Sequence, residues 1–223
     1  YDYILDDQKY LHKDGKPVIF FYLYRSMPSS FRNALCLVLN DIWQNEFATS
    51  KTPYIAADVM FGNAQTIPTN DAGWINAMTT YDVYGQTSKG RSVIEETDVA
   101  AYHKEINNWA NANPSLDVIT CISPGYNDRG VRLQEDHVGL ARYLKNWDHG
   151  SLFKAHFKHF NLETKPTGTH WIVINSWNEW QEDSIIEPVS GGATTNKPTN
   201  ITSGNTYESY GTKYVNIVGD YMV

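Results

Sequence analysis

The sequence predicts an α/β fold built on a parallel sheet, and three observations support that prediction. Short apolar runs rich in Val, Ile and aromatic residues recur along the chain without the alternation typical of half-exposed strands. Stretches with apolar residues at helical spacing separate these runs. The 223 residues show no internal repeat and no second domain boundary, so we expect a single domain over residues 1–223.

The expected elements alternate along the chain. Strands are expected at 16–24, 52–61, 77–81, 116–126 and 170–177. Helices are expected at 31–47, 96–114 and 152–163, and residues 210–222 are a candidate closing helix. Thr97 is the expected N-cap of the second helix, which Pro114 ends. The stretch 189–206 is rich in Gly, Ser, Thr, Asn and Pro and predicts a long loop.

Five parallel strands fit two architectures: a doubly wound open sheet and part of a (β/α)8 barrel. No Gly-x-Gly-x-x-Gly or phosphate-binding loop follows any expected strand, which argues against a nucleotide-binding open sheet. A complete barrel takes roughly 250 residues. If the chain forms a barrel, about three strands are expected to be missing or reduced on the N-terminal side.

Charge and composition exclude several classes of protein. The net charge is -7, and no run of Lys and Arg offers a nucleic-acid surface. No apolar stretch of roughly 18 residues predicts a membrane span. The opening Tyr1-Asp2-Tyr3 has neither Met nor a signal pattern, so we expect a processed form or a fragment.

The two cysteines, Cys36 and Cys121, are either a disulfide or two buried thiols, and they are too few to form a zinc site by themselves. The pattern Asn200-Ile201-Thr202 would accept a glycan in a secreted protein.

Polar and aromatic side chains gather just after the expected strands, where ligands bind in both architectures. These side chains are Tyr22, Tyr24 and Arg25, then Asp58, Met60 and Asn63, then Tyr81, Asp82 and Tyr84, then Ser123, Tyr126, Asp128, Arg129 and Arg132, and last Asn175, Trp177, Asn178, Glu179, Trp180 and Glu182. Rings that stack, amides and hydroxyls that bind hydroxyls, and carboxylates that move protons suit a polyhydroxylated ligand. The high aromatic content of 13% has a second interpretation, which is simple filling of the core.

Glu179 and Glu182 are the candidate catalytic pair. Residues three apart on a helical turn have Cβ atoms roughly 5–6 Å apart, and retaining glycosidases hold their carboxyl groups about 5–5.5 Å apart. If the chain turns helically after Trp177, like charge and burial would drive the two pKa values apart, leaving one acid and one base. The alternative is a solvated acidic turn that caps a following helix.

Several motifs resemble glycoside hydrolase family 99, the endo-α-mannosidase and endo-α-mannanase family. "SWNEWQEDSIIEP" is similar to that family's [ST]-[FW]-N-E-W-x-E-G-T-x-I-E motif. "SPGYNDRGVR", "DGKPVIFFYLY", "MTTYDVYG" and the closing Tyr207, Tyr210 and Tyr214 are also similar. The motif N-x-W-N-E-W-x-E is shared with the related WbsX-like polysaccharide-cluster proteins.

The resemblance implies a (β/α)8 TIM-type barrel whose first strands lie outside this chain. It implies retaining hydrolysis of an internal α-mannosidic bond through a 1,2-anhydro sugar, with no metal and no cofactor. By position, Glu179 would deprotonate the substrate 2-hydroxyl, and Glu182 would be the general acid/base.

The remaining candidates are substrate-binding. The resemblance implies that Tyr126 lies beside the reacting sugar, that Trp177 and Asn178 shape the −1 region and that Tyr81 is a lesser contact. Trp180, Tyr24 and Arg132 are further expected contacts on their position after the strands.

Asp183 and Ser184 depart from the Gly-Thr of the family motif. Asp183 adds a negative charge beside the pair and removes a flexible backbone position, so we expect a raised pKa of Glu182 or a changed substrate. Arg142 is the candidate for the family's Arg position.

Two other functions stay open. One is a non-catalytic carbohydrate-binding or structural barrel protein, and the other is glycosyl transfer in polysaccharide assembly. A glycan substrate and the sequon at Asn200 favour a secreted, periplasmic or secretory-pathway protein.

Overall fold

The computed structural model describes residues 8–45, 52–59, 74–132, 137–163, 171–190 and 209–222, together with Ile4 and Asp6. Its sheet contains β1 (His12–Lys13), β2 (Lys16–Phe21), β3 (Tyr54–Asp58), β4 (Ala77–Thr79), β5 (Asp117–Ile122) and β6 (Trp171–Ile174). The helices are η1 (Tyr24–Ser26), α2 (Ser29–Asn45), α3 (Val83–Ser88), α4 (Glu96–Ala112), α5 (Ser151–Glu163), η2 (Trp180–Glu182) and α7 (Lys213–Tyr221). The alternation predicted from the sequence is confirmed, and the strands end earlier than predicted because their polar exits turn away from the sheet.

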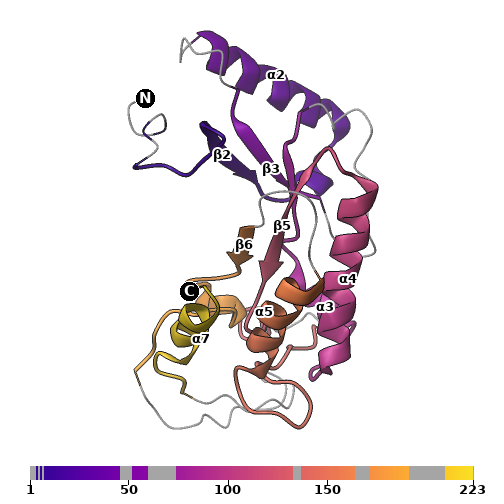
Figure 1. Ribbon diagram of the computed structural model, residues 1–223, viewed down its shortest axis with the longest axis vertical. Helices are drawn as coiled ribbons and strands as arrows, with labels where there is room; N and C mark the ends of the chain where they lie inside the picture. Colours follow the sequence, from indigo (N-terminus) through magenta and orange to yellow (C-terminus); the bar gives the residue numbers. More distant parts are fainter. Residues whose placement is uncertain are drawn as a thin grey trace.

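The strands lie in sequence order, β1-β2-β3-β4-β5-β6. β1 forms an antiparallel hairpin with β2, and every pair from β2 to β6 is parallel. A doubly wound sheet reverses its strand order at a switch point, and no reversal occurs here. The winding is therefore that of a barrel, and the strands form a curled half-barrel (Figure 1). Closure into a complete barrel is not confirmed: among the described residues, β6 pairs only with β5.

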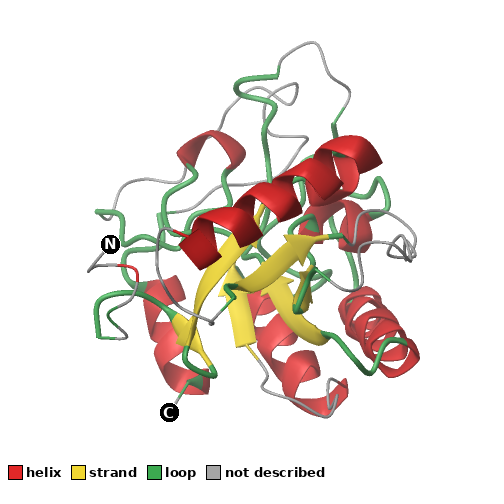
Figure 2. Cartoon of the chain, turned by 90° about the horizontal axis from the view of Figure 1, so that it is seen from above, coloured by secondary structure: helices red, strands yellow, loops and turns green. Residues whose placement is uncertain are grey.

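The main core lies between the sheet and the helices that follow its strands. Met78 of β4 is fully buried, as are Ile106 of α4 and Cys121 of β5, and all three belong to one hydrophobic cluster. α4 packs beside β5 and against α5 (Figure 1), and Figure 2 shows the helices arranged around the strands. Apolar residues at period 3.6 on α4 produce this packing because they form one continuous face.

Details of the predicted elements change in the structure. The N-cap of α4 is Glu95, not Thr97, because the Glu95 and Asp98 side chains form a capping box with each other's backbone N–H groups. Cys36 and Cys121 are both free and buried, so the disulfide alternative is wrong.

Three regions of the sequence prediction fall outside the described residues: Met60 and Asn63, the sequon at Asn200, and most of the predicted loop 189–206. Within the described ranges, no helix has both the length and the apolarity needed to cross a bilayer.

Candidate active site

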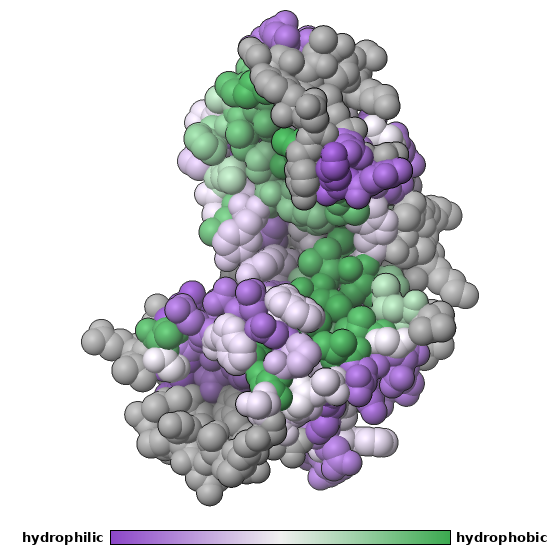
Figure 3. Space-filling view, turned by 90° about the vertical axis from the view of Figure 1, so that its left-hand side faces the viewer, coloured by the Kyte–Doolittle hydropathy of each residue, from purple (hydrophilic) through white to green (hydrophobic). Residues whose placement is uncertain are grey.

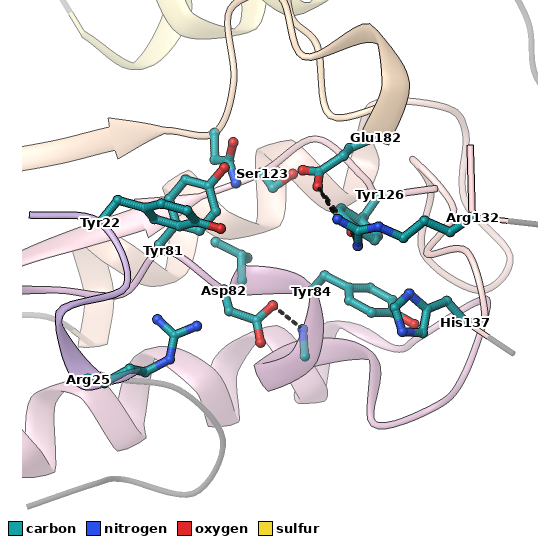
Figure 4. Close-up of a pocket in the computed structure, with 13 residues that line it drawn as sticks. Tyr22, Arg25, Tyr81, Asp82, Tyr84, Ser123, Tyr126, Arg132, His137 and Glu182 are labelled. Atoms are coloured by element: carbon teal, nitrogen blue, oxygen red, sulfur yellow. Dashed lines mark hydrogen bonds and ion pairs between the residues drawn. The ribbon is translucent and has the colours of Figure 1, made fainter. Parts of the chain in front are cut away.

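A cavity of about 270 Å³ lies at the carboxyl ends of the parallel strands. The residues that line it come from four strand exits: Tyr22 and Arg25 after β2, Tyr81, Asp82, Val83, Tyr84 and Gly85 after β4, Ser123, Tyr126, Arg132 and His137 after β5, and Asn175 and Glu182 after β6. Figure 4 shows Glu182 and Arg132 on one side of this cavity and Arg25 on the other. This is the edge of the sheet at which parallel α/β folds bind ligands.

The backbone between Glu179 and Glu182 forms a helical turn, which is the condition on which the sequence-based pairing of the two glutamates depended. η2 covers Trp180–Glu182 and begins directly after Glu179. Ser176 Oγ accepts a hydrogen bond from the Glu179 N–H at 2.8 Å, and the Glu182 carbonyl accepts one from the Asn127 N–H at 2.6 Å. Glu179 is the residue before this 3₁₀ turn and Glu182 is its last residue, so the two glutamates lie at the two ends of one turn.

Glu182 is a cavity carboxyl group whose environment favours its protonated form, and burial also raises the pKa of the cavity residue Asp82. Burial raises the pKa of Glu182, and the charge of Glu179 raises it further, while Arg132 opposes the shift. Arg132 Nη2 lies 3.7 Å from Glu182 Oε1, on a side chain that is 44% exposed. Burial and a neighbouring negative charge, the two effects expected from the sequence, are thus the main causes of the raised pKa of Glu182.

Tyr126 joins Glu182 to a second, buried carboxylate. Its hydroxyl lies 3.4 Å from Glu182 Oε1 and 3.0 Å from Asp128 Oδ2, and its ring stacks on Tyr84 at a centroid distance of 4.4 Å. Burial raises the pKa of the Tyr126 hydroxyl, and the charges of Glu182 and Asp128 add to that effect. The hydroxyl therefore stays neutral and is both a donor and an acceptor.

The opposite side of the cavity is fixed by hydrogen bonds to Asp58 and Asp82. The Arg25 guanidinium pairs with Asp58, which also accepts a hydrogen bond from the Leu23 N–H at 3.2 Å. Asp82 caps α3 by accepting a hydrogen bond from the Gly85 N–H at 2.8 Å. A Cβ on Gly85 would lie 2.2 Å from Asp82 Oδ2, so a larger residue at this position would displace the Asp82 side chain.

No group of His, Cys, Asp and Glu within the described ranges is arranged to hold a metal ion. The cavity lining offers carboxyl, hydroxyl and guanidinium groups. Proton transfer at a bound hydroxyl or ether oxygen suits this set of groups.

The family model described as Glycosyltransferase WbsX matches residues 2–194. The chain belongs to this family. No curated protein matches the chain.

Three solved structures share the fold of this WbsX-family chain. A glycoside hydrolase-like protein matches with a TM-score of 0.65 and 16% identity, over 96% of this chain and 56% of that one. The family 99 endo-α-mannosidase from Bacteroides thetaiotaomicron matches with a TM-score of 0.56 and 18% identity, over 97% of this chain and 57% of that one. The same enzyme in complex with bis-tris propane matches at 17% identity over 97% of this chain and 61% of that one, again with a TM-score of 0.56. The WbsX-family chain thus spans less than two thirds of each of these structures.

Four of the nine residues predicted to be catalytic or substrate-binding line the cavity: Glu182, Tyr126, Tyr81 and Arg132. Trp177, Asn178 and Trp180 lie on the exposed surface around η2, with Trp177 53% and Trp180 57% exposed. Glu179 lies beside Glu182, as its effect on the Glu182 pKa shows, but it is not part of the cavity lining.

Tyr24 lies elsewhere than predicted. Its side chain is 1% exposed and packs in the main hydrophobic core, where its ring contacts Phe21 at a centroid distance of 6.2 Å. Leu23 has a left-handed backbone (φ 54°), so the chain reverses there, and the cavity tyrosine of this exit is Tyr22. Tyr22 contacts Tyr81 with ring centroids 4.5 Å apart.

His137 is a cavity residue that the sequence analysis did not single out. Its Nδ1 lies 2.8 Å from Asp128 Oδ2, nine residues earlier in the chain. No periodicity or motif marks it, because its place depends on the path of the loop after β5. Asp82, Tyr84, Ser123 and Asn175 also line the cavity, and their positions after strands were the signal that identified them.

Asp183, which stands where the family 99 motif has glycine, pairs with Arg142. It has a left-handed backbone (φ 47°), and its Oδ1 accepts from Arg142 Nη2 at 2.9 Å. Arg142 is 4% exposed, also donates to the Asp183 and Ile185 carbonyls, and lies over the ring of Tyr214 at 4.8 Å. The Asp183 charge is thus paired with a buried guanidinium, and the groups that raise the Glu182 pKa are Glu179 and Asp128.

Proposed function

We propose that this WbsX-family chain carries the active site of a glycoside hydrolase that cleaves internal α-linked, mannose-type bonds with retention. The observation that carries the proposal is Glu182: a half-buried carboxyl group with a raised pKa, in contact with Tyr126 and influenced by Glu179, in an aromatic-lined cavity at the strand ends. A general acid needs a pKa close to the working pH, and this environment moves Glu182 in that direction.

The proposed reaction assigns one step to each carboxyl group. Glu179 removes the proton of the substrate 2-hydroxyl, whose oxygen attacks the anomeric carbon to form a 1,2-anhydro sugar. Glu182 gives its proton to the departing glycosidic oxygen as that bond breaks. Glu182 then removes a proton from water, and the water oxygen attacks the anomeric carbon. The bond between the anomeric carbon and the 2-oxygen breaks as this happens, and Glu179 returns its proton to the 2-oxygen. The two inversions give net retention.

The cavity walls support a sugar ligand. Tyr22 and Tyr84 present ring faces and edges, and Asn175 presents an amide that can bind hydroxyl groups. At about 270 Å³ the cavity falls just below the roughly 300–1,000 Å³ of small-molecule sites, so it fits one ring rather than a chain. Trp177 and Trp180, exposed on the rim, would stack on the neighbouring sugars of an internally cleaved chain.

We also propose that further strands complete the half-barrel into a (β/α)8 barrel. A groove of about 540 Å³ lies between the two end strands of the parallel sheet, lined by Leu11 and Met222, by Phe20 of β2, and by Trp171, Ile172 and Val173 of β6. Figure 3 shows apolar surface in the upper half of this side of the molecule.

α2 exposes a second apolar surface next to β2, formed by Phe31, Leu37, Val38 and Ile42. Contiguous apolar surface of this kind marks a covered face. Strands added to the edges of β2 and β6 would cover the groove, and their helices would cover α2. The solved structures are long enough to supply such strands, since this chain spans only 56–61% of them.

Glycosyl transfer in polysaccharide assembly is the second candidate, because the matching family is described as a glycosyltransferase. The same two carboxyl groups could pass a sugar to a hydroxyl acceptor instead of water. The sequence carries no diphosphate-binding motif, which favours hydrolysis. A glycan substrate also leads us to propose a secreted, periplasmic or secretory-pathway location.

The test incubates full-length protein with α-mannan and with glucosyl-mannose oligosaccharides, and follows internal cleavage and product configuration by NMR. Glu182→Gln and Glu179→Gln are each expected to lower the rate by at least about 10²-fold. Glu187→Gln, which removes a carboxylate of the same segment outside the cavity lining, is the matched control and should retain activity.

Cleavage unaffected by Glu182→Gln would overturn the role of that residue. Transfer to an added sugar acceptor without hydrolysis would favour the transferase. Binding with no turnover of any α-linked glycan would favour a carbohydrate-binding protein.

A further inference from the structure

Asp82 is a second carboxyl group in the cavity, and the proposed reaction gives it no part. It follows β4, is half-buried, and lines the cavity with the nearby Tyr81 and Tyr84. Its Oδ1 accepts a hydrogen bond from the Gly85 N–H at 2.8 Å and so caps the first turn of α3. This structural role uses only one of the two carboxyl oxygens, and the other has a different environment.

The second oxygen, Oδ2, is open to the cavity. Among the residues that the structure describes, no N–H or O–H group donates to it, and it is not one of the polar side-chain atoms that are shut off from solvent. Gly85 leaves the space that this oxygen occupies, since an added Cβ would lie 2.2 Å from it. A carboxyl oxygen without a partner is costly once water is displaced. A ligand that fills the cavity therefore has to supply the missing hydrogen bond.

Asp82 and Glu182 face the cavity from different sides. The Gly85 N–H, Arg25 and His137 favour the charged form of Asp82 against the effect of burial, and Glu182 is not among the charges that act on it. Figure 4 shows the Asp82 carboxyl on the side of Arg25, and Glu182 on the side of Arg132. A sugar ring with its anomeric carbon at Glu182 therefore presents another part of the ring to Asp82. The hydroxyls remote from the anomeric carbon of a hexose are the 3-, 4- and 6-hydroxyls.

We propose that Asp82 is a specificity-determining residue, whose Oδ2 accepts a hydrogen bond from a free hydroxyl of the sugar bound in the cavity, remote from the anomeric carbon. The orientation of the ring toward Glu182 rests on the proposed function, whereas the need for a free hydroxyl does not. A site that hydrogen-bonds a hydroxyl rejects an analogue that lacks it, because the buried acceptor is then left without a donor. A branch or an ester at the same position also removes the hydrogen. The substrates are therefore glycans whose cavity sugar is unsubstituted there.

The test measures binding to full-length protein by titration calorimetry, first with the methyl α-glycosides of mannose, glucose and galactose. The 3-, 4- and 6-deoxy forms of the glycoside that binds most tightly are then compared with it. The wild type should bind one of these deoxy forms about tenfold or more weakly, which corresponds to the loss of one strong hydrogen bond.

Asp82→Ser is the informative variant, because serine caps a helix as well as aspartate does but has no second oxygen. It should bind the parent glycoside about tenfold or more weakly than the wild type, and it should bind the parent and the deoxy form equally. The loss of discrimination identifies the contact, since two changes that remove the same hydrogen bond are not additive. Equal discrimination in the wild type and in Asp82→Ser would overturn the proposal, and so would a wild type that binds none of the three glycosides.

Glu95→Ser is the matched control. Glu95 is also a carboxylate at a helix N-cap, that of α4, but it does not line the cavity, so binding and discrimination should stay as in the wild type. Asp82→Ala removes the cap as well as the second oxygen and should melt at a lower temperature than Asp82→Ser. If Asp82→Ser does not fold, Asp82→Asn takes its place, because asparagine keeps the capping oxygen and puts a donor where the second oxygen was.

Binding is measured without turnover, so the failure of the proposed function and the failure of this proposal are distinguishable. A protein that discriminates through Asp82 but cleaves no glycan loses the proposed function alone. A protein that cleaves a glycan, with the KM of Asp82→Ser unchanged, loses the role of Asp82 alone. If both hold, Asp82→Ser should raise KM about tenfold or more, whereas a variant that is only partly unfolded would lower kcat and leave KM unchanged.

Discussion

The left-handed residue after η2 offers a direct test of the structural argument for Asp183. Asp183 combines a backbone φ of 47° with a hydrogen bond to Arg142 at 2.9 Å. Asp183→Ala and Asp183→Gly both remove the carboxylate, so the loss of that bond is common to the two variants. They differ in backbone freedom, because only glycine adopts this conformation without strain.

The magnitudes follow from these two contributions. A hydrogen bond to a charged group stabilises by about 1.5–3 kcal/mol, and the lower half of that range applies because the Asp183 side chain is 24% exposed. A Cβ in the left-handed region costs roughly 1–2 kcal/mol. We therefore expect Asp183→Ala to lower the free energy of unfolding by about 2 kcal/mol, and Asp183→Gly to be about 1 kcal/mol more stable than Asp183→Ala.

The assay is urea unfolding followed by tryptophan fluorescence, with the free energy of unfolding compared at constant m-value. Asp148 is the matched control, since it is exposed and is not among the residues with positive φ. At such a site alanine is more stable than glycine by about 0.4–1 kcal/mol, so the order reverses. If Asp183→Gly is no more stable than Asp183→Ala, the backbone explanation for this departure from the family 99 motif is wrong.

Three other substitutions test the site and the sheet. Glu182→Gln should stabilise the protein at pH 7 and give no gain in stability below the ordinary pKa of 4.5. The reason is that a carboxyl group with a raised pKa in the folded state destabilises the protein as the pH rises above the pKa of the unfolded state. An equal gain at pH 7 and pH 4 in urea unfolding would contradict this. Gly85→Ala should destabilise the protein by about 1–3 kcal/mol, because the added Cβ would collide with Asp82. Gly130→Ala is the control and should be tolerated, because a Cβ there meets nothing within 4 Å. Similar melting temperatures for the two variants would contradict the packing described. Phe20→Ala should lower the free energy of unfolding of the full-length protein by about 3–5 kcal/mol if further strands cover β2. If the groove stays open, the free energy of unfolding should change by less than about 0.5 kcal/mol.

The order and type of the elements could be predicted from the sequence because they depend on local patterns. The apolar residues of α4 repeat at helical spacing, and β3 and β5 are apolar runs, so each element identifies itself without knowledge of its neighbours. β1 and α3 were not predicted, because two and six residues are too few to establish a period.

The location of the site also followed from the sequence. Parallel strands bring their carboxyl ends to one edge, so residues after β2, β4, β5 and β6 had to lie near one another. The spacing of Glu179 and Glu182 suited a catalytic pair only if the chain turned helically after Trp177, and η2 forms such a turn.

What the sequence determined, then, is which elements form and at which edge of the sheet the chemistry gathers, since both depend on residues close together in the chain. The tertiary structure decided which side chains face the cavity and what state they are in. Tyr22 and not Tyr24 enters the cavity because Leu23 reverses the chain, and Asp183 pairs with Arg142, which lies 41 residues away. Glu182 favours its proton because burial and groups on separate loops act on it together. The burial of a group and the effect of neighbouring charges on it depend on distances in space, which the sequence alone does not give.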